Sequence, residues 1–235
     1  MADDAGGFIR GAVRPLACYT GAWEVIRHHY WLYFGVTAVG VLLGSAAPLG
    51  LLMGPMFCGI YACYFRGMAK EPVDFSDLFR GFDFIVQSLI ASLFMMLAGL
   101  LLALPTVGGV VIAAILGASK FRAQAFPFQI FIWIGVAVLV MLALFVLLAT
   151  FTTFVYPLIV DRRLMAVEAF KTSIRAGLAN FWGLLALLVL NMLLGLVGVL
   201  FCYVGAFLVM PLTMAATACA YRQVFPVQAA AGPGD

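Results

Sequence analysis

The sequence has little charge. Only 13 of its 235 residues are Lys or Arg and 10 are Asp or Glu, so charged residues make up 10% of the chain. A soluble domain carries roughly 25%. The hydrophobic share is 66% and the mean hydropathy is +1.14. This composition excludes an ordinary soluble domain, and the net charge of +3 is too small to indicate a nucleic-acid partner.

Several functional signals are also missing. The first thirty residues contain no apolar segment followed by a small-residue cleavage site, so we expect the first span to act as the targeting signal. The apolar runs lack the two-residue alternation of porin strands. None of the five cysteines forms a C-x-x-C pair, and we interpret them as packing residues. No metalloprotease, nucleophile-elbow or phosphate-loop motif occurs, which predicts no enzyme activity, cofactor or resident metal.

What the chain does contain is a series of apolar runs, each of about the length that crosses a bilayer. Every charged residue lies outside these runs. We therefore predict an all-α polytopic membrane protein with about six transmembrane helices. A turn near residues 46–48 divides the first long run, and a turn near 195–198 divides the last. The predicted spans are 32–46, 48–65, 84–104, 128–157, 181–199 and 201–221.

The stretch 84–119 is ambiguous, because Pro105 and two glycines interrupt it. It can be read as one kinked helix, a helix with a re-entrant piece, or two short spans. Two full spans would place the four cations of 158–180 outside the cell, against the positive-inside rule. We therefore favour six spans with 104–119 as a continuation or re-entrant piece. Both termini are then cytoplasmic, in a bacterial inner membrane.

Two segments, 9–31 and 161–180, have the periodicity of amphipathic helices at the membrane surface. In the second segment, apolar residues recur at spacings of three and four and cations occupy the other side. We predict an interfacial basic face there. Its residues are Arg162, Arg163, Lys171 and Arg175; the apolar residues are Val167, Phe170, Ile174 and Leu178.

A probable internal repeat follows from matched stretches in the two halves. Pro55, Ala62-Cys63 and Arg66 recur with the same spacing as Pro211, Ala218-Cys219 and Arg222. Each repeat unit reads as a surface helix, an aromatic anchor and a helical hairpin. We expect both prolines to kink the return helices and both arginines to hold the cytoplasmic exits. The units are 9–67 and 161–223, joined by the spans at 84–119 and 128–157 within one membrane domain at 1–225; a flexible tail follows at 226–235.

Candidate functional groups are few. Asn191, Gln87, Thr150 and Thr153 lie in or beside apolar runs, where they would form either interhelical contacts or a polar pathway. His28 and His29 are adjacent and cannot share one helix face as a metal pair. Carboxylates in the first cytoplasmic loop would act as helix caps and arginine partners or, alternatively, hold Mg²⁺. These carboxylates are Glu71, Asp74, Asp77 and Asp83.

Residues 156–182, YPLIVDRRLMAVEAFKTSIRAGLANFW, resemble a pattern in uncharacterised bacterial multi-span membrane proteins. The G-P-x-x-x-G at 54–59 and DLFRGF at 77–82 look like the same group. The group is similar to the membrane domain that accompanies some glycerophosphodiester phosphodiesterases and to related domain-of-unknown-function families. The resemblance implies a shared membrane fold over about 20–225. The chain has no length for a soluble phosphodiesterase domain, so we do not expect hydrolysis.

Two functional hypotheses remain at this point. The first is a non-enzymatic membrane protein that acts as a scaffold, an accessory subunit or a partner-binding module. The alternative is a lipid or small-amphiphile transporter resembling a flippase. The expected partners are membrane lipids and either another protein subunit or a second copy of the chain.

Overall fold

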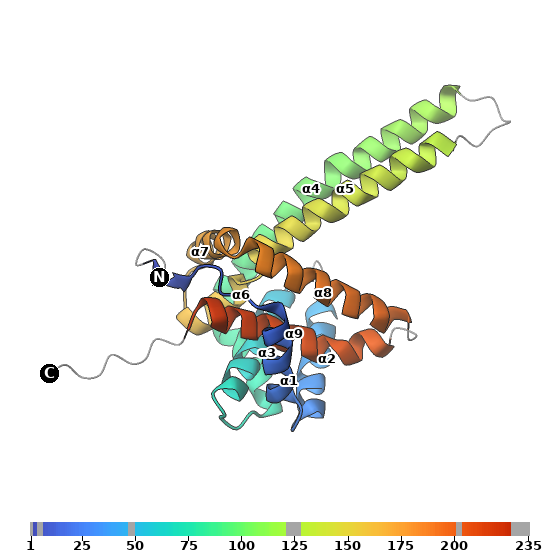
Figure 1. Ribbon diagram of the computed structural model, residues 1–235. Coiled ribbons are helices and arrows are strands. Elements are labelled where there is room, and N and C mark those ends of the chain that lie inside the picture. Colours follow the sequence, from blue (N-terminus) through green and yellow to red (C-terminus); the bar gives the residue numbers. More distant parts are fainter. Residues whose placement is uncertain (1, 4–6, 47–49, 121–127, 201–203, 227–235) are drawn as a thin grey trace. The chain divides into compact units, whose positions relative to one another are not determined.

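The computed structural model describes residues 2–3, 7–46, 50–120, 128–200 and 204–226. The described chain is helical, as predicted, apart from a short antiparallel pairing of β1 with β2 near the N-terminus. The helices appear in Figure 1. In chain order the elements are β1 (Ala2–Asp3), β2 (Phe8–Ile9), α1 (Pro15–Ile26), α2 (Tyr30–Ala46), α3 (Met53–Met68), η2 (Phe75–Phe84), α4 (Ile85–Lys120), α5 (Phe128–Thr152), α6 (Val155–Arg162), α7 (Ala166–Ala179), α8 (Phe181–Leu200) and α9 (Val204–Val224).

The chain forms two compact units. Unit 1 comprises Met1–Ser92 and Thr150–Asp235, and unit 2 comprises Leu93–Ala149. Unit 2 is therefore built from the C-terminal part of α4 and most of α5. The predicted membrane domain at 1–225 includes residues of both units. Most of the predicted tail, 227–235, lies outside the described residues.

Helix α3 is the core of unit 1. It packs against α2, η2, α6 and α9, and ten of its sixteen residues are buried. Small residues let η2 lie directly on its backbone. A Cβ added at Gly59 would lie 1.9 Å from the carbonyl oxygen of Leu78, and one added at Gly81 would lie 2.0 Å from that of Pro55. The close packing of these two backbones thus explains Gly59 of the G-P-x-x-x-G segment and Gly81 of DLFRGF.

Four helical stretches among the described residues are long and apolar enough to cross a membrane. They are Phe75–Gly109, Ile134–Arg162, Phe181–Leu200 and Val204–Val224, while Tyr30–Ala46 is a shorter apolar helix. The predicted span at 48–65 corresponds to α3, which faces protein on most sides. The ambiguous stretch 104–119 lies within the continuous helix α4, with Pro105 inside it. These helices support the membrane class.

The two matched arginines both form ion pairs at the ends of their helices. Arg66 pairs with Glu71 at 3.2 Å and with Asp77, and Arg222 Nη2 lies 2.9 Å from an oxygen of Asp161. The Arg222 guanidinium also lies 4.4 Å from the centre of the Phe65 ring.

The expectation for the first proline is wrong, because Pro55 is the third residue of α3. In the first turn a missing N–H interrupts no helical hydrogen bond. Pro211, by contrast, lies inside α9, as expected. Its carbonyl oxygen accepts a hydrogen bond of 3.1 Å from the Tyr64 hydroxyl of α3.

The two predicted surface helices differ from the observed ones. Residues 9–31 do not form one helix: α1 begins at Pro15, after a turn in which Gly11 has a φ of +63°. Residues 161–180 are interrupted at Arg163, which ends α6 in the left-handed conformation with a φ of 49°. Helix α7 then starts at Ala166. The apolar periodicity continues through the interruption at Arg163, which is why the sequence pattern did not reveal it.

Candidate functional site

Asn191, the most isolated polar residue of the apolar runs, lies on α8 and accepts a hydrogen bond from the Tyr19 hydroxyl of α1. Burial, together with the nearby Cys18, raises the pKa of Tyr19 to about 12, so this phenol stays protonated and donates. The two residues are 172 positions apart. The bond joins an N-terminal helix to a helix of the second half of the chain.

Gln87 of α4 forms a hydrogen bond with the start of α7. Its side-chain oxygen accepts a hydrogen bond of 2.9 Å from the backbone N–H of Ala166, the first residue of α7. The first N–H groups of a helix have no partner within the helix, and the preceding Met165 cannot cap them with its side chain. A residue of α4 therefore caps the start of α7.

The threonines lie at the junction of α5 and α6. Thr150 is fully buried, and both Thr150 and Thr153 take part in interactions with the rest of the chain. The residue that sequence reasoning missed here is Ser173 of α7. Its hydroxyl donates to the carbonyl of Phe151 at 2.7 Å and accepts from the N–H of Phe154 at 3.3 Å. The small-residue spacing around Ser173 was the available signal.

Asn191 and Gln87 therefore contact different helices, and none of the four polar candidates lines either of the two cavities described below. In the described part of the chain, no buried side-chain nitrogen or oxygen lacks a hydrogen-bond partner. Asn191 and Gln87 have interhelical hydrogen bonds, while their use in a polar pathway stays a prediction.

Two of the four cations of the predicted basic face lie at the end of α6, and the other two lie on α7. Arg162 donates to the carbonyl of Gly7 at 3.0 Å and lies 4.9 Å from the Phe225 ring centre, so it is engaged within unit 1. Arg163 lies 6.0 Å from the Phe84 ring centre. Only Lys171 and Arg175 lie on α7, and both are exposed. The basic face of α7 itself thus consists of two residues.

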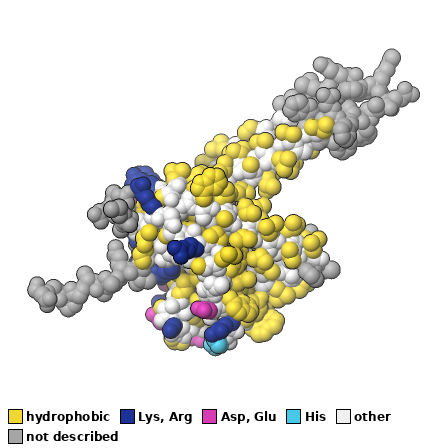
Figure 2. Space-filling view, in the orientation of Figure 1, with side chains coloured by type: hydrophobic (Ala, Val, Ile, Leu, Met, Phe, Trp, Pro, Cys, Tyr) yellow, Lys and Arg dark blue, Asp and Glu magenta, His cyan; other side chains and the backbone are white. Residues whose placement is uncertain are grey.

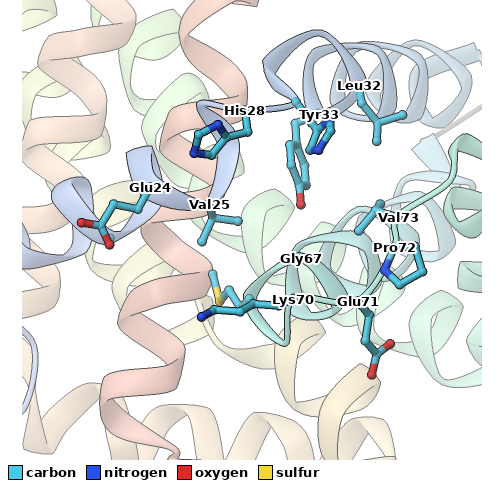
Figure 3. A pocket seen from close by; sticks show the side chains of 13 residues that line it. Glu24, Val25, His28, Leu32, Tyr33, Gly67, Lys70, Glu71, Pro72 and Val73 are labelled. Carbon is cyan, nitrogen blue, oxygen red and sulfur yellow. The ribbon is translucent and has the colours of Figure 1, made fainter.

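The larger described cavity is in unit 1, between α1, the start of α2 and the end of α3, and has a volume of about 700 Å³ (Figure 3). The Tyr33 ring points from α2 toward Gly67, where an added Cβ would lie 1.9 Å from its hydroxyl oxygen. Lys70, at the end of α3, has a left-handed φ of 59°. The lining residues are Gly21, Glu24, Val25, His28, His29, Leu32, Tyr33, Gly67, Met68, Lys70, Glu71, Pro72 and Val73.

The smaller cavity, about 360 Å³, is lined by Glu71 and Asp83, two of the four carboxylates for which the sequence left two roles open. Arg66 donates to Asp77, and Arg80 approaches the same carboxylate at 3.6 Å. Asp77 also accepts from the N–H of Asp74 at 2.9 Å, within a capping box at the start of η2. The cap and arginine-partner roles therefore describe Asp74 and Asp77. Among the described residues, no three His, Cys, Asp or Glu side chains form a metal-binding group.

Comparison of the chain with protein-family models, with curated proteins and with solved structures gave no match. The resemblance noted for residues 156–182 thus stays a prediction. Function has to be argued from the arrangement of the residues alone.

Proposed function

We propose that this chain is a non-enzymatic integral membrane protein that acts as a scaffold, an accessory subunit or a partner-binding module. The observation that carries the proposal is the surface of unit 2. In the most apolar windows of the stretches Phe75–Gly109 and Ile134–Arg162, only 11% and 6% of the residues are buried. On the face drawn in Figure 2, the described part of unit 2 displays hydrophobic side chains.

This surface has the properties of a helix pair that lies in lipid and receives another membrane helix. Lys120 is the sole charged residue of unit 2 in its described part. Cβ atoms added at Gly99, Gly108, Gly109 or Gly135 would meet nothing within 4 Å. In membranes, small residues allow close helix approach, because the hydrophobic effect gives helices no preference for each other over lipid.

Substitution of these open glycines tests the proposal. Gly99→Leu and Gly135→Leu should leave the fold intact but block close approach of a partner helix. A membrane protein that co-purifies with the wild-type chain from native membranes should then be lost, as measured by mass spectrometry. Gly195→Leu is the matched control, since that glycine of α8 also has open space around it. Equal retention by all variants, or retention of lipid alone, contradicts the partner-binding function.

The topology that we propose has six spans, both termini in the cytoplasm and a bacterial inner membrane as its location. In support, the paired cations Arg66 and Arg222 end the return helices of both predicted hairpins. A reporter fused after Arg222 should be cytoplasmic, and one inserted at 123–125 should be external. A cytoplasmic result at 123–125 would contradict the six-span count.

The proposed repeat, 9–67 and 161–223, has support from the burial pattern. Tyr33 and Val36 are buried two and five residues after Trp31. Leu184 and Leu187 are buried at the same distances after Trp182. We also propose that the chain shares its fold, and not its activity, with the membrane domain that accompanies some glycerophosphodiester phosphodiesterases.

The alternative, handling of a lipid or small amphiphile, is favoured by one observation. The 700 Å³ cavity combines titratable side chains such as His28 and Lys70 with an apolar wall that includes Val25 and Leu32. A Val73→Trp substitution places a larger ring in this cavity and should weaken binding of a fluorescent lysophospholipid. Val189→Trp, on the exposed face of α8, is the control. Unchanged binding in Val73→Trp would contradict a role for this cavity.

A further inference from the structure

We infer that the outward face of α7 binds the headgroup layer of the cytoplasmic leaflet and prefers anionic phospholipids. This inference rests on the proposed membrane insertion and adds the class of lipid and the surface that recognises it. On a helical wheel that places Ala166 at 0° and advances 100° per residue, α7 has three faces. Small buried residues lie at about 280° to 20°, and apolar residues lie at about 40° to 120°. Charged residues lie at about 140° to 200°.

The first face fixes the helix against unit 1. It consists of small residues, and at Gly177 an added Cβ would lie 3.3 Å from the Cα of Phe151. Ser173 bonds the α5–α6 junction in the middle of the helix, and Gln87 caps its start. At its end, Asn180 donates to the carbonyls of Ala176 and Ile9, both at 3.0 Å, and accepts from the N–H of Ala12 at 2.8 Å. The helix therefore cannot rotate to hide its other faces.

The second face is apolar and turned outward. Val167 is 49% exposed, Ile174 41% and Leu178 61%. Met165 before the helix and Trp182 after it are 58% and 79% exposed. Transfer of such side chains from water to an apolar environment lowers their free energy, so a continuous exposed stripe of them favours contact with an apolar phase.

The third face carries Lys171 and Arg175, with Glu168 as its one acidic residue. The two cations directly adjoin the apolar stripe on the helical wheel. A helix lying in the membrane surface with its stripe in the acyl region would hold these cations at the level of lipid phosphates. Complementary charge therefore favours anionic headgroups over zwitterionic ones.

The position of α7 in the chain selects a lipid surface over a protein partner. Asn180 alone separates it from α8, which is one of the stretches long enough to span the membrane. The exposed Trp182 lies in the first turn of α8, and tryptophan favours the membrane interface. If α8 starts at the membrane boundary, α7 must lie at that boundary too.

The test uses the full chain reconstituted into liposomes of phosphatidylcholine with phosphatidylglycerol. Native mass spectrometry measures the ratio of the two lipids retained by the protein. Each cation near an anionic surface contributes about 1 kcal/mol, or roughly fivefold. The double variant Lys171→Gln/Arg175→Gln should therefore lower the retained phosphatidylglycerol ratio about 25-fold, whereas Glu168→Gln should raise it.

Arg14→Gln/Arg27→Gln is the matched control, because it removes the same charge from exposed positions outside α7 and outside the 700 Å³ cavity. An equal fall in that control would mean that retention follows net charge, and would overturn the inference. A second readout is a single tryptophan placed at Leu178, with the native tryptophans replaced by phenylalanine. Brominated lipid should quench it, whereas absence of quenching would show that protein covers the face and would also overturn the inference.

These results separate the inference from the proposal on which it rests. If the wild-type chain fails to float with liposomes after an alkaline wash, membrane insertion itself is wrong. If it floats but its lipid ratio is unchanged by the α7 variants, only the inference about α7 is wrong. Circular dichroism of each variant confirms that the helices are retained.

Discussion

Replacing Gly59 by alanine should separate α3 from η2. The added Cβ would lie 1.9 Å from the Leu78 carbonyl oxygen and 2.9 Å from its carbonyl carbon. A carbon and a carbonyl oxygen normally approach to about 3.3–3.6 Å, so one backbone must move by more than 1 Å. Overpacking typically costs about 1–3 kcal/mol, and we expect the upper part of this range because both neighbours are backbone atoms.

The matched control is Gly195→Ala, where an added Cβ meets nothing within 4 Å. Both substitutions exchange glycine for alanine inside a helix, which by itself favours the folded state by about 1 kcal/mol. The difference in free energy of unfolding between the two variants therefore isolates the clash. Unfolding in mixed micelles with increasing denaturing detergent, followed by circular dichroism, measures this difference.

The result that would refute the reasoning is a Gly59→Ala protein as stable as Gly195→Ala. Such a result would mean that η2 does not lie on α3 at Gly59. The packing of η2 on α3 would then also fail to explain the Arg66–Asp77 ion pair, because this packing places Asp77 beside α3.

Three further predictions concern contacts between distant parts of the chain. Tyr19→Phe and Asn191→Leu should each lower the free energy of unfolding by about 0.6–2 kcal/mol, and the double variant should cost less than their sum; strict additivity would contradict the bond. Asp161→Asn removes a half-buried partner of Arg222 and should cost about 1–3 kcal/mol, with no change in stability as the contrary result. Burial raises the pKa of the Cys18 thiol from 9.0 to about 11, so its thiolate is roughly a hundredfold scarcer at pH 8. Because the thiol is also fully buried, its alkylation at pH 8 should be far slower in the folded protein than in the denatured chain, and equal rates would contradict this environment.

The pH dependence of stability follows from the same shift. Because the pKa of Cys18 is higher in the folded protein, its contribution is complete below pH 9. As the pH rises from about 9 to 11, the unfolded chain releases this proton first, and the contribution is lost.

The long apolar helices of the second half of the chain were the most predictable from sequence. The predicted spans 181–199 and 201–221 agree closely with α8 and α9, because run length, the aromatic start and the absence of charge all depend on local sequence. The segment 48–65 has a similar composition, yet α3 is mostly covered by protein. Hydropathy measures how strongly a side chain favours an apolar environment over water. It does not distinguish a lipid environment from a protein interior.

The candidate site residues show the same limit. Asn191 was recognisable as a polar residue that needs a partner, but nothing near it in the sequence indicates Tyr19, 172 positions away. Gln87 likewise caps a helix 79 positions later. The start of α1 was locally readable from Pro15, but the apolar periodicity before it favoured an earlier start.

The packing of α1 against α9 constrains the order of events during synthesis. The two helices pack against each other, and the Gln223 side chain accepts hydrogen bonds from the Arg14 N–H and the Cys18 thiol. Roughly 180 residues separate the end of α1 from the start of α9. Because translation adds about 5–20 residues per second, α9 is synthesised roughly 10–40 s after α1. During this interval the residues of α1 that are buried in the folded protein, Cys18, Ala22 and Ile26, must contact another apolar surface. The nascent N-terminus should therefore be the part of this protein that depends most on lipid or an insertion factor.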